Sequence, residues 1–340
     1  TFSETHVIWP ITTPACAGIS TSFIGLAAMV VIEQKAKGKL KGMFGSYVSS
    51  DLVEQMVDSG EEPKLGGEET GITAFFSDVQ AFSSFSELLT PTGLVDLMNE
   101  YLTAMTNILQ EERGTLDKYI GDAIVAFYGA PLELKDHELL ACRTAIKMQE
   151  RLAVLREQWQ AEGERWPEIV HHMQNRIGIN TGKMVTGNMG SESRMNYTMM
   201  GDTVNLAARL ESSAKQYGVY IQISDSTYES VKDQIVVRAL DFVRVMGKTE
   251  PVKVFELISE KGQEPEPYKK ILPAFHEGLE HYFKQDWDNA IEAFKAADEL
   301  EEMFPGRKTN PSRIYIPRCE NFKENPPGDD WDGVWTQTSK

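Results

Sequence analysis

Apolar residues between about residue 71 and residue 260 follow two spacings, one typical of strands and the other typical of helices. Short runs rich in β-branched and aromatic residues predict strands, and longer stretches with an apolar residue at every third or fourth position predict helices. The predicted strands span residues 72–77, 115–119, 123–128, 175–180, 219–223, 235–245 and 252–258, with a hairpin at 185–200. The predicted helices span residues 86–112, 138–159 and 202–217.

The first six of these elements follow the order strand, helix, strand, strand, helix, strand. This is the order of the ferredoxin-like split βαβ unit, in which helices cover one face of the sheet. We therefore predict an α+β fold with a mixed sheet, formed by a domain that spans residues 68–260.

Residues 7–32 contain no charged side chain. As a helix, residues 11–32 would span about 33 Å, which is enough to cross a bilayer. Four lysines follow between residues 35 and 41, as expected on the cytoplasmic side. We predict a transmembrane helix at 7–32 that ends a larger N-terminal region, which places the protein in the cell membrane with its later domains in the cytoplasm. Pro10, Pro14 and Gly18 keep a buried soluble helix as the alternative.

Residues 33–67 form a predicted helical connector, with apolar residues at helical spacing before the turn-forming Pro63, Gly66 and Gly67. These apolar faces either pair with a second copy of the chain or pack on the neighbouring domain.

After the central domain, residues 261–304 are predicted to form a helical pair. The spacing of Gly278, Ala290, Phe294 and Ala297 resembles one tetratricopeptide unit. A single unit cannot bury its own apolar face, so we expect it to dock on the preceding domain or on another copy. Residues 305–340 are predicted to be an irregular tail.

Composition narrows the possible functions. A net charge of −17 argues against a nucleic-acid-binding protein, because neutralising phosphates requires a basic surface. The three cysteines are too far apart to predict a disulfide framework or a metal site, and we expect free thiols. The chain begins with Thr1, which suggests a piece of a longer polypeptide.

Two carboxylates stand out against this background. Asp78 follows the first strand, and Asp122 lies in the turn of the hairpin at 115–128. In a ferredoxin-like sheet the first strand lies beside this hairpin, so both side chains are expected at one edge. Two aspartates, a backbone carbonyl and substrate phosphate oxygens are suitable ligands for Mg²⁺ or Mn²⁺.

A third group of polar residues lies on the helix after Gly201. Asn205 and Arg209 are four residues apart and share one helix face, where they could bind a ribose and a phosphate. Lys248, in a Gly-containing loop between two strands, could also reach a phosphate.

With these motifs in sequence order, the chain resembles the class III nucleotidyl cyclase catalytic domain. The match covers about residues 68 to 260. The residues that carry it lie at 75–79 (Phe-Phe-Ser-Asp-Val), 117–122 (Asp-Lys-Tyr-Ile-Gly-Asp), 176–182 (Arg-Ile-Gly-Ile-Asn-Thr-Gly) and 197–211.

The resemblance implies an adenylate cyclase, a lyase that converts ATP to 3′,5′-cyclic AMP and pyrophosphate in signal transduction. It implies two divalent metal ions, Mg²⁺ or Mn²⁺, held by Asp78, Val79 and Asp122. Asn205 would position the ribose, and Arg209 would offset charge on the α-phosphate. The terminal phosphates would be bound by Lys248 and by the N–H groups of Ala81, Phe82 and Ser83.

Two further positions bear on the choice of base. Lys118 lies where adenylyl cyclases carry Lys and guanylyl cyclases typically carry Glu. Thr198 is typical of the bacterial and soluble-cyclase branch, and its hydroxyl can accept from the adenine amino group. Some members of that branch respond to bicarbonate. The sequence departs from the family at Ala81, where Gly is usual.

In this family the metal residues and the Asn/Arg pair meet across a head-to-tail dimer, so a homodimer with two equivalent sites is implied. The alternatives are a guanylyl cyclase, a catalytically weak nucleotide-sensing or scaffold domain, and a diguanylate cyclase or polymerase relative. Lys118 and Thr198 argue against the first. The second usually lacks a metal Asp or the Asn/Arg pair, and both are present here. The third lacks its typical hairpin sequence.

Overall fold

The computed structural model describes residues 64–243, 252–303, 307–328 and 330–333, together with Gly25, Leu26, Ala28 and Met29. Most of the predicted transmembrane helix at 7–32, most of the connector at 33–67, and Lys248 lie outside these residues. Within the described part of the chain, no helix is both long enough and apolar enough to cross a membrane. Residues from Lys64 onward form one compact unit.

The centre of this unit is an eight-stranded sheet. Four strands lie in the order β2-β3-β1-β4, each antiparallel to its neighbour, as predicted for the ferredoxin-like unit. β6 pairs in parallel with β4, β8 and β7 follow, and β5 pairs with β4 alone, so the sheet is mixed as expected. The strands are β1 (Gly66–Val79), β2 (Thr115–Ile120), β3 (Ala123–Tyr128), β4 (Asn175–Ser191), β5 (Arg194–Met200), β6 (Ile221–Ser224), β7 (Ile235–Val243) and β8 (Val252–Glu260).

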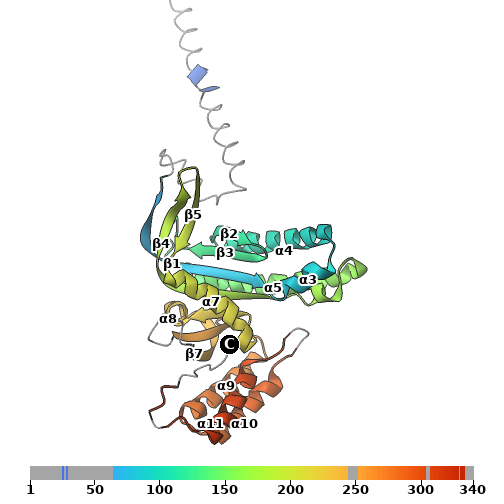
Figure 1. Cartoon of the computed structure of the whole chain (residues 1–340), viewed down its shortest axis with the longest axis vertical. Helices are drawn as coiled ribbons and strands as arrows, with labels where there is room; N and C mark the ends of the chain where they lie inside the picture. The colour runs from blue at the N-terminus through green and yellow to red at the C-terminus, as the bar shows by residue number, and fades with distance from the viewer. Residues whose placement is uncertain are drawn as a thin grey trace, which may run out of the picture. The chain divides into compact units, whose positions relative to one another are not determined.

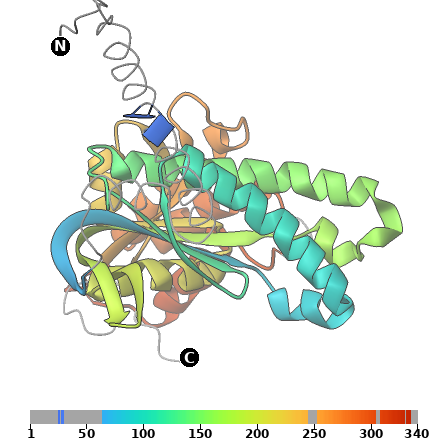
Figure 2. The ribbon, with the colours of Figure 1, turned by 90° about the horizontal axis from the view of Figure 1, so that it is seen from above.

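Side chains of β1 alternate between two apolar layers. Phe75 and Val79 join the larger core, which α4 (Pro91–Glu111) and α5 (His137–Ala161) cover. Figure 2 shows these two helices running side by side. Ile72 and Ala74 face the other way, into a smaller cluster that includes Ala207 of α7 (Asp202–Tyr217). Helices therefore cover both faces of the sheet, with α7 on the far side of β1 and β4 from α4 (Figure 1). The prediction that helices cover one face only was wrong, because Gly178 of β4 lets α7 pack on the second face.

Several predicted boundaries were wrong. The single helix at 86–112 is two helices, α3 (Phe82–Leu88) and α4, because Pro91 starts a new helix that the Thr90 side chain caps. β1 begins at Gly66, and β4 continues without a break into the predicted hairpin. Short helices that the sequence pattern did not predict are η1 (Gly163–Arg165), α6 (Glu168–His171) and α8 (Asp225–Val231).

The described part of the C-terminal region holds three helices, α9 (Tyr268–Phe283), α10 (Trp287–Leu300) and α11 (Pro311–Glu324). The predicted helical pair is confirmed, but the tail is not irregular. Its helix α11 begins with Pro at its first position, and the Asn310 side chain caps it by accepting from the Arg313 N–H at 3.0 Å. The tetratricopeptide assignment stays a prediction.

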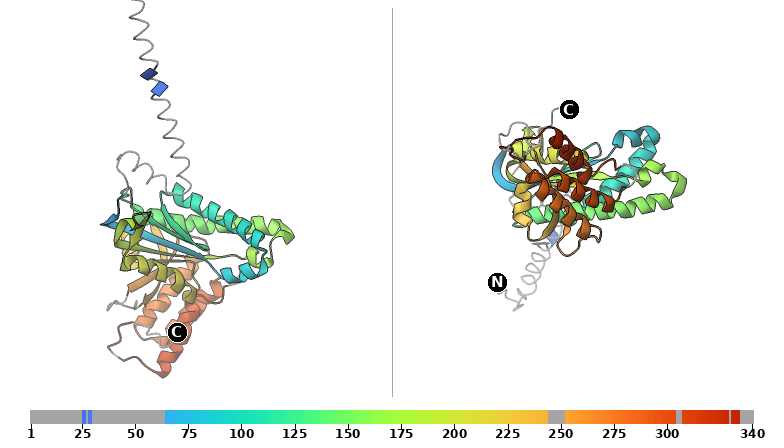
Figure 3. Two further views of the ribbon diagram at one scale, coloured as in Figure 1. Left: turned by 45° about the horizontal axis from the view of Figure 1, so that its top comes forward. Right: turned by 90° about the horizontal axis from the view of Figure 1, so that it is seen from below.

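These helices dock on the preceding domain, one of the two predicted outcomes. Arg238 of β7 is fully buried, and its guanidinium donates to the carboxylates of Glu256 in β8 and Glu301 after α10, at 2.6–2.8 Å. The Tyr315 hydroxyl of α11 donates to the backbone oxygen of Leu240 at 2.5 Å. Figure 3 shows the three helices packed together beside the sheet.

Candidate active site

Asp78 and Asp122 lie side by side at one edge of the sheet. β1 pairs with β3 up to Ser77 and Ile124, which brings the last residues of β1 next to the β2–β3 turn. There the Val79 N–H donates to Asp122 Oδ2 at 3.1 Å, and the Asp78 and Asp122 carboxyls are close enough to share a hydrogen bond. The predicted convergence of these two residues is confirmed.

The surroundings of Asp78 carry an excess of negative charge. Burial and the carboxylates of Asp122 and Glu211 together raise its pKa to about 7, while the charge on Arg176 opposes the shift. A divalent cation would relieve this repulsion, so the residues present fit a metal ion. No cluster of three or more His, Cys, Asp or Glu side chains suited to a metal occurs among the described residues.

Arg176 and Glu211 belong to this cluster, although the sequence assigned them no role. Arg176 lies directly opposite Asp78 in the β1–β4 register, and its guanidinium is 3.3 Å from the Asp78 carboxylate. Its Nε donates to Glu211 of α7 at 3.0 Å. The signal that could have found Arg176 is its place opposite Asp78 in the β1–β4 pair. That register is not encoded in any local sequence pattern, so the sequence alone did not reveal it.

The two predicted base-reading residues also meet. Lys118 Nζ in β2 donates to Thr198 Oγ1 in β5 at 3.4 Å, across 80 residues of chain. β5 is not a neighbour of β2 in the sheet order, but its Tyr197 ring packs 6.0 Å from Phe127 of β3. The β4–β5 ribbon thus folds back over the hairpin and forms a second polar site.

Asn205 and Arg209 are exposed on α7. The opposite side of this helix packs on Gly178 of β4, where an added Cβ would lie 2.3 Å from the Ala207 oxygen and 2.2 Å from the Glu211 nitrogen. At roughly 100° per residue, positions 205 and 209 lie on the helix face away from that contact. Within one chain, the structure therefore does not bring them together with Asp78.

The turn after Asp78 and the start of α3 hold the three residues predicted to bind phosphate. Ala81 has a left-handed backbone with φ of 60°, which explains why Gly is usual there, and it precedes α3, which starts at Phe82. Ser83 follows in the first turn.

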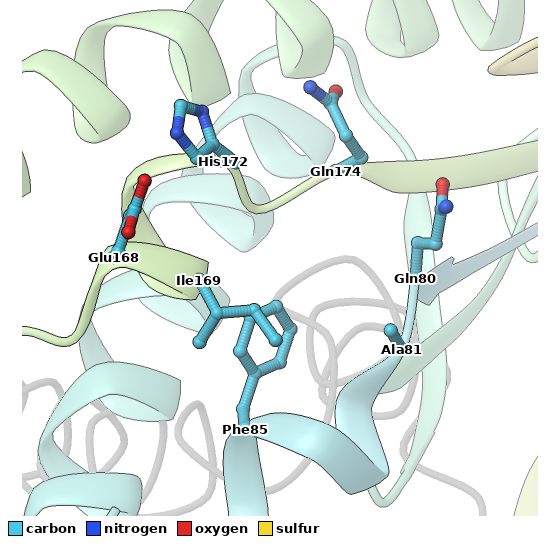
Figure 4. A pocket seen from close by; sticks show the side chains of 7 residues that line it. All are labelled: Gln80, Ala81, Phe85, Glu168, Ile169, His172 and Gln174. Carbon is cyan, nitrogen blue, oxygen red and sulfur yellow. The ribbon is translucent and has the colours of Figure 1, made fainter. Parts of the chain in front are cut away.

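Behind this turn lies a cavity of about 300 Å³. Figure 4 shows that Phe85 and Ile169 project into it from α3 and α6. Among the predicted site residues that the structure describes, Ala81 alone lines it, so it is separate from the two carboxylates. Its lining consists of Gln80, Ala81, Phe85, Glu168, Ile169, His172 and Gln174.

Comparisons with known proteins agree with this geometry. Residues 67–259 match the sequence model of the family described as the adenylate and guanylate cyclase catalytic domain. The terminal-differentiation-specific adenylate cyclase of Dictyostelium discoideum is 32% identical over 84% of this chain and 13% of its own length. Adenylate cyclase 1 of Rhizobium meliloti is 32% identical over 63% of this chain and 31% of its own length.

Two solved structures have similar folds. The adenylyl cyclase CyaB from P. aeruginosa has a TM-score of 0.52 and 36% identity, over 59% of this chain and all of that chain. A guanylyl cyclase structure has the same TM-score and 33% identity, over 58% of this chain and 97% of that chain. The chain spans less than a third of the length of the two curated relatives, and overall similarity does not separate the two base specificities.

Proposed function

The chain belongs to the family of adenylate and guanylate cyclase catalytic domains, and from this premise we propose that it is an adenylyl cyclase. The ribose 3′-oxygen of ATP attacks the α-phosphorus, the bond to the β-phosphate oxygen breaks, and pyrophosphate leaves as the 3′-hydroxyl proton is lost. The observation that carries the proposal is the pairing of Asp78 with Asp122 beside the end of β1.

In this proposal Asp78, Asp122 and the Val79 carbonyl hold two divalent ions, Mg²⁺ or Mn²⁺. When bound, these ions would supply Lewis-acid chemistry, by making the 3′-hydroxyl more acidic and by neutralising the triphosphate. The chain's own part is to hold both carboxylates in place. The Val79 N–H fixes Asp122, and Arg176 limits the repulsion at Asp78.

The remaining site residues bind and orient ATP in the proposed complex. Lys118 donates to adenine N1, and Thr198 accepts from the 6-amino group, which their 3.4 Å separation supports. Asn205 positions the ribose, and Arg209 offsets charge that develops on the α-phosphate. The terminal phosphates are bound by Lys248 and by the N–H groups of Ala81, Phe82 and Ser83.

The active enzyme is proposed to be a homodimer. Because α7 directs Glu211 towards Asp78 and Arg209 to the opposite side, one chain cannot surround the substrate with both sets of residues. A second copy, arranged head to tail, would supply its Asn205 and Arg209 to the Asp78 site of the first chain. The first chain would supply the same two residues to the Asp78 site of the second.

We also propose roles for the segments on either side of the catalytic domain. Residues 7–32 would anchor the chain in the cell membrane, residues 33–67 would connect that helix to the catalytic domain at 68–260, and the domain would work in the cytoplasm. Residues 261–304 would be a tetratricopeptide-like pair. A fractionation experiment tests the anchor: the full chain should pellet with membranes and be released by detergent.

One assay tests the proposed activity. The purified chain is incubated with ATP or GTP and either Mg²⁺ or Mn²⁺, and the products are identified by mass spectrometry. Cyclic AMP from ATP is the expected product, and its formation should be lost in Asp78→Asn and in Asp122→Asn. Formation of cyclic GMP from GTP, without cyclic AMP from ATP, would identify a guanylyl cyclase. Nucleotide binding without any cyclic product would identify a sensor domain.

A further inference from the structure

A bulge in β2 places Asp117 in an unusual position. Along the β2–β3 pair, Leu116 lies opposite Ala126 and Lys118 lies opposite Val125, so Asp117 is an extra residue without a partner. In a regular strand, neighbouring side chains point to opposite faces. The bulge removes this alternation, and the side chains of both Asp117 and Lys118 reach Thr198.

Three polar groups are thereby locked together. The Thr198 hydroxyl donates to Asp117 Oδ2 at 2.5 Å. The other oxygen of Asp117 lies 3.4 Å from Lys118 Nζ, and the carboxylate is almost fully buried, with 2% of its side chain exposed. Burial raises the pKa of Asp117, while the hydrogen bond from Thr198 and the charge on Lys118 oppose that shift.

The hydrogen bond to Asp117 decides which part of the Thr198 hydroxyl faces a ligand. A threonine hydroxyl has one proton and two lone pairs, and on its own it can serve as donor or as acceptor. Here the proton is committed to Asp117, and one lone pair accepts from Lys118. Only the second lone pair is left for a base, so the residue can act towards that base only as an acceptor.

We propose that Asp117 is a specificity-determining positioning residue, which makes Thr198 an obligate acceptor and thereby selects adenine over guanine. The 6-amino group of adenine is a donor and satisfies that lone pair, whereas the 6-oxygen of guanine is an acceptor and meets it unfavourably. This inference rests on the proposed function, because it assumes that the Lys118–Thr198 site reads the base.

A purely structural role is the competing explanation, since the same hydrogen bond also ties β5 to β2. The two roles differ in what a substitution changes. Loss of a strand contact lowers stability and the rates with both nucleotides together. Loss of the acceptor at 117 frees the Thr198 hydroxyl to rotate and donate to guanine, so the ratio of the ATP rate to the GTP rate falls.

The experiment measures kcat/KM of the full chain for ATP and for GTP. Asp117→Ala should reduce the ATP:GTP ratio roughly tenfold, the usual effect of one hydrogen bond at a buried site. Asp117→Asn, which keeps an oxygen that can accept from Thr198, should retain most of the ratio. Thr115→Val is the matched control, because it removes a buried β2 hydrogen bond to the Ala130 oxygen and should leave the ratio unchanged.

A double-substitution cycle completes the test. If Asp117 acts through Thr198, then Asp117→Ala should have no further effect on the ratio in a Thr198→Ala background. The proposal is overturned if Asp117→Ala keeps the wild-type ratio, or if the two effects multiply.

Nucleotide binding by the same variants separates a failure of this inference from a failure of the proposed function. If the wild-type chain makes no cyclic nucleotide, the proposed activity fails, and the ratio of dissociation constants for ATP and GTP replaces the rate ratio. A wild-type chain that binds ATP in preference to GTP, with the preference lost in Asp117→Ala, supports the inference. Equal binding of both nucleotides by the wild type overturns it.

Discussion

At the scale of single residues, Asp78 lies among more negative than positive charge. Partial burial and two neighbouring carboxylates hold its pKa at about 7, against an ordinary value of 3.8, and Arg176 is the cation that opposes the shift. The positions of Asp78 and Asp122 could be predicted because each follows an apolar strand. The roles of Arg176, Glu211 and Asp117 could not, because they depend on strand register, helix packing and a bulge.

Metal binding and proton binding should therefore compete at Asp78. Between about pH 4 and pH 7 the metal-free folded chain retains a proton that the unfolded chain has lost, so this group's contribution to stability falls as the pH rises. A divalent ion requires the ionised form. The increase in Tm produced by Mn²⁺ should be larger at about pH 8 than at about pH 6, and absent in Asp78→Asn. An equal increase at both pH values would contradict this assignment.

The left-handed backbone at Ala81 gives a second prediction at this scale. Ala81→Gly should raise the free energy of unfolding by about 1 kcal/mol, because a left-handed conformation is costly for any residue with a Cβ. Ala81→Val should lower it, since a β-branched side chain tolerates positive φ poorly. Urea unfolding of the three chains measures both changes, and the reverse order of stability would show that the turn is not strained.

At the scale of elements, the backbone of α7 packs directly on the backbone of β4, with no side chain between the helix and the strand. Gly178 of β4 permits this approach, and it sets the direction in which Asn205 and Arg209 point. The sequence predicted α7, but not which face of the helix is buried. It also missed α11, because Pro311, Pro317 and the polar residues around them weaken the helical pattern, and tertiary packing of Tyr315 and Cys319 overrides that weakness.

A methyl group at position 178 should separate α7 from β4. Its Cβ would overlap backbone atoms of Ala207 and Glu211, which cannot move aside without shifting the helix. Gly178→Ala should destabilise the chain by about 2 kcal/mol and should reduce cyclase activity more than tenfold. Gly71→Ala in β1, where nothing lies within 4 Å of the added carbon, is the control and should change neither. Equal behaviour of the two variants would rule out the close contact.

At the scale of the whole molecule, the catalytic domain and the C-terminal helices share buried charges. The arrangement of the four strands β2-β3-β1-β4 could be predicted from the sequence, because the order of strands and helices leaves few ways to pair them, but the places of β5, β6, β7 and β8 in the sheet were not predicted. The docking of α9–α11 could be narrowed only to two outcomes, since Arg238 and Glu301 lie 63 residues apart in the chain and no local sequence pattern shows that they pair.

Removing the buried cation should lower the free energy of unfolding far more than removing a partly exposed one. Arg238→Leu leaves Glu256 and Glu301 buried without this partner and should lower the free energy of unfolding by about 3–5 kcal/mol. Arg143→Leu breaks the partly exposed pair with Glu260 and should cost about 1 kcal/mol or less. Chemical denaturation compares the two variants, and similar losses would mean that the Arg238 network does not join the two parts.

The most direct test of the proposed shared site mixes two inactive chains. In a random mixture of equal amounts of Asp78→Ala and Arg209→Ala, half of the dimers are mixed, and each mixed dimer contains one intact site, so cyclic AMP formation should recover to about one quarter of the wild-type rate. Each variant alone should be inactive. If both variants are inactive alone and the mixture stays inactive although the chains exchange, then Asp78 and Arg209 do not form one site across two chains.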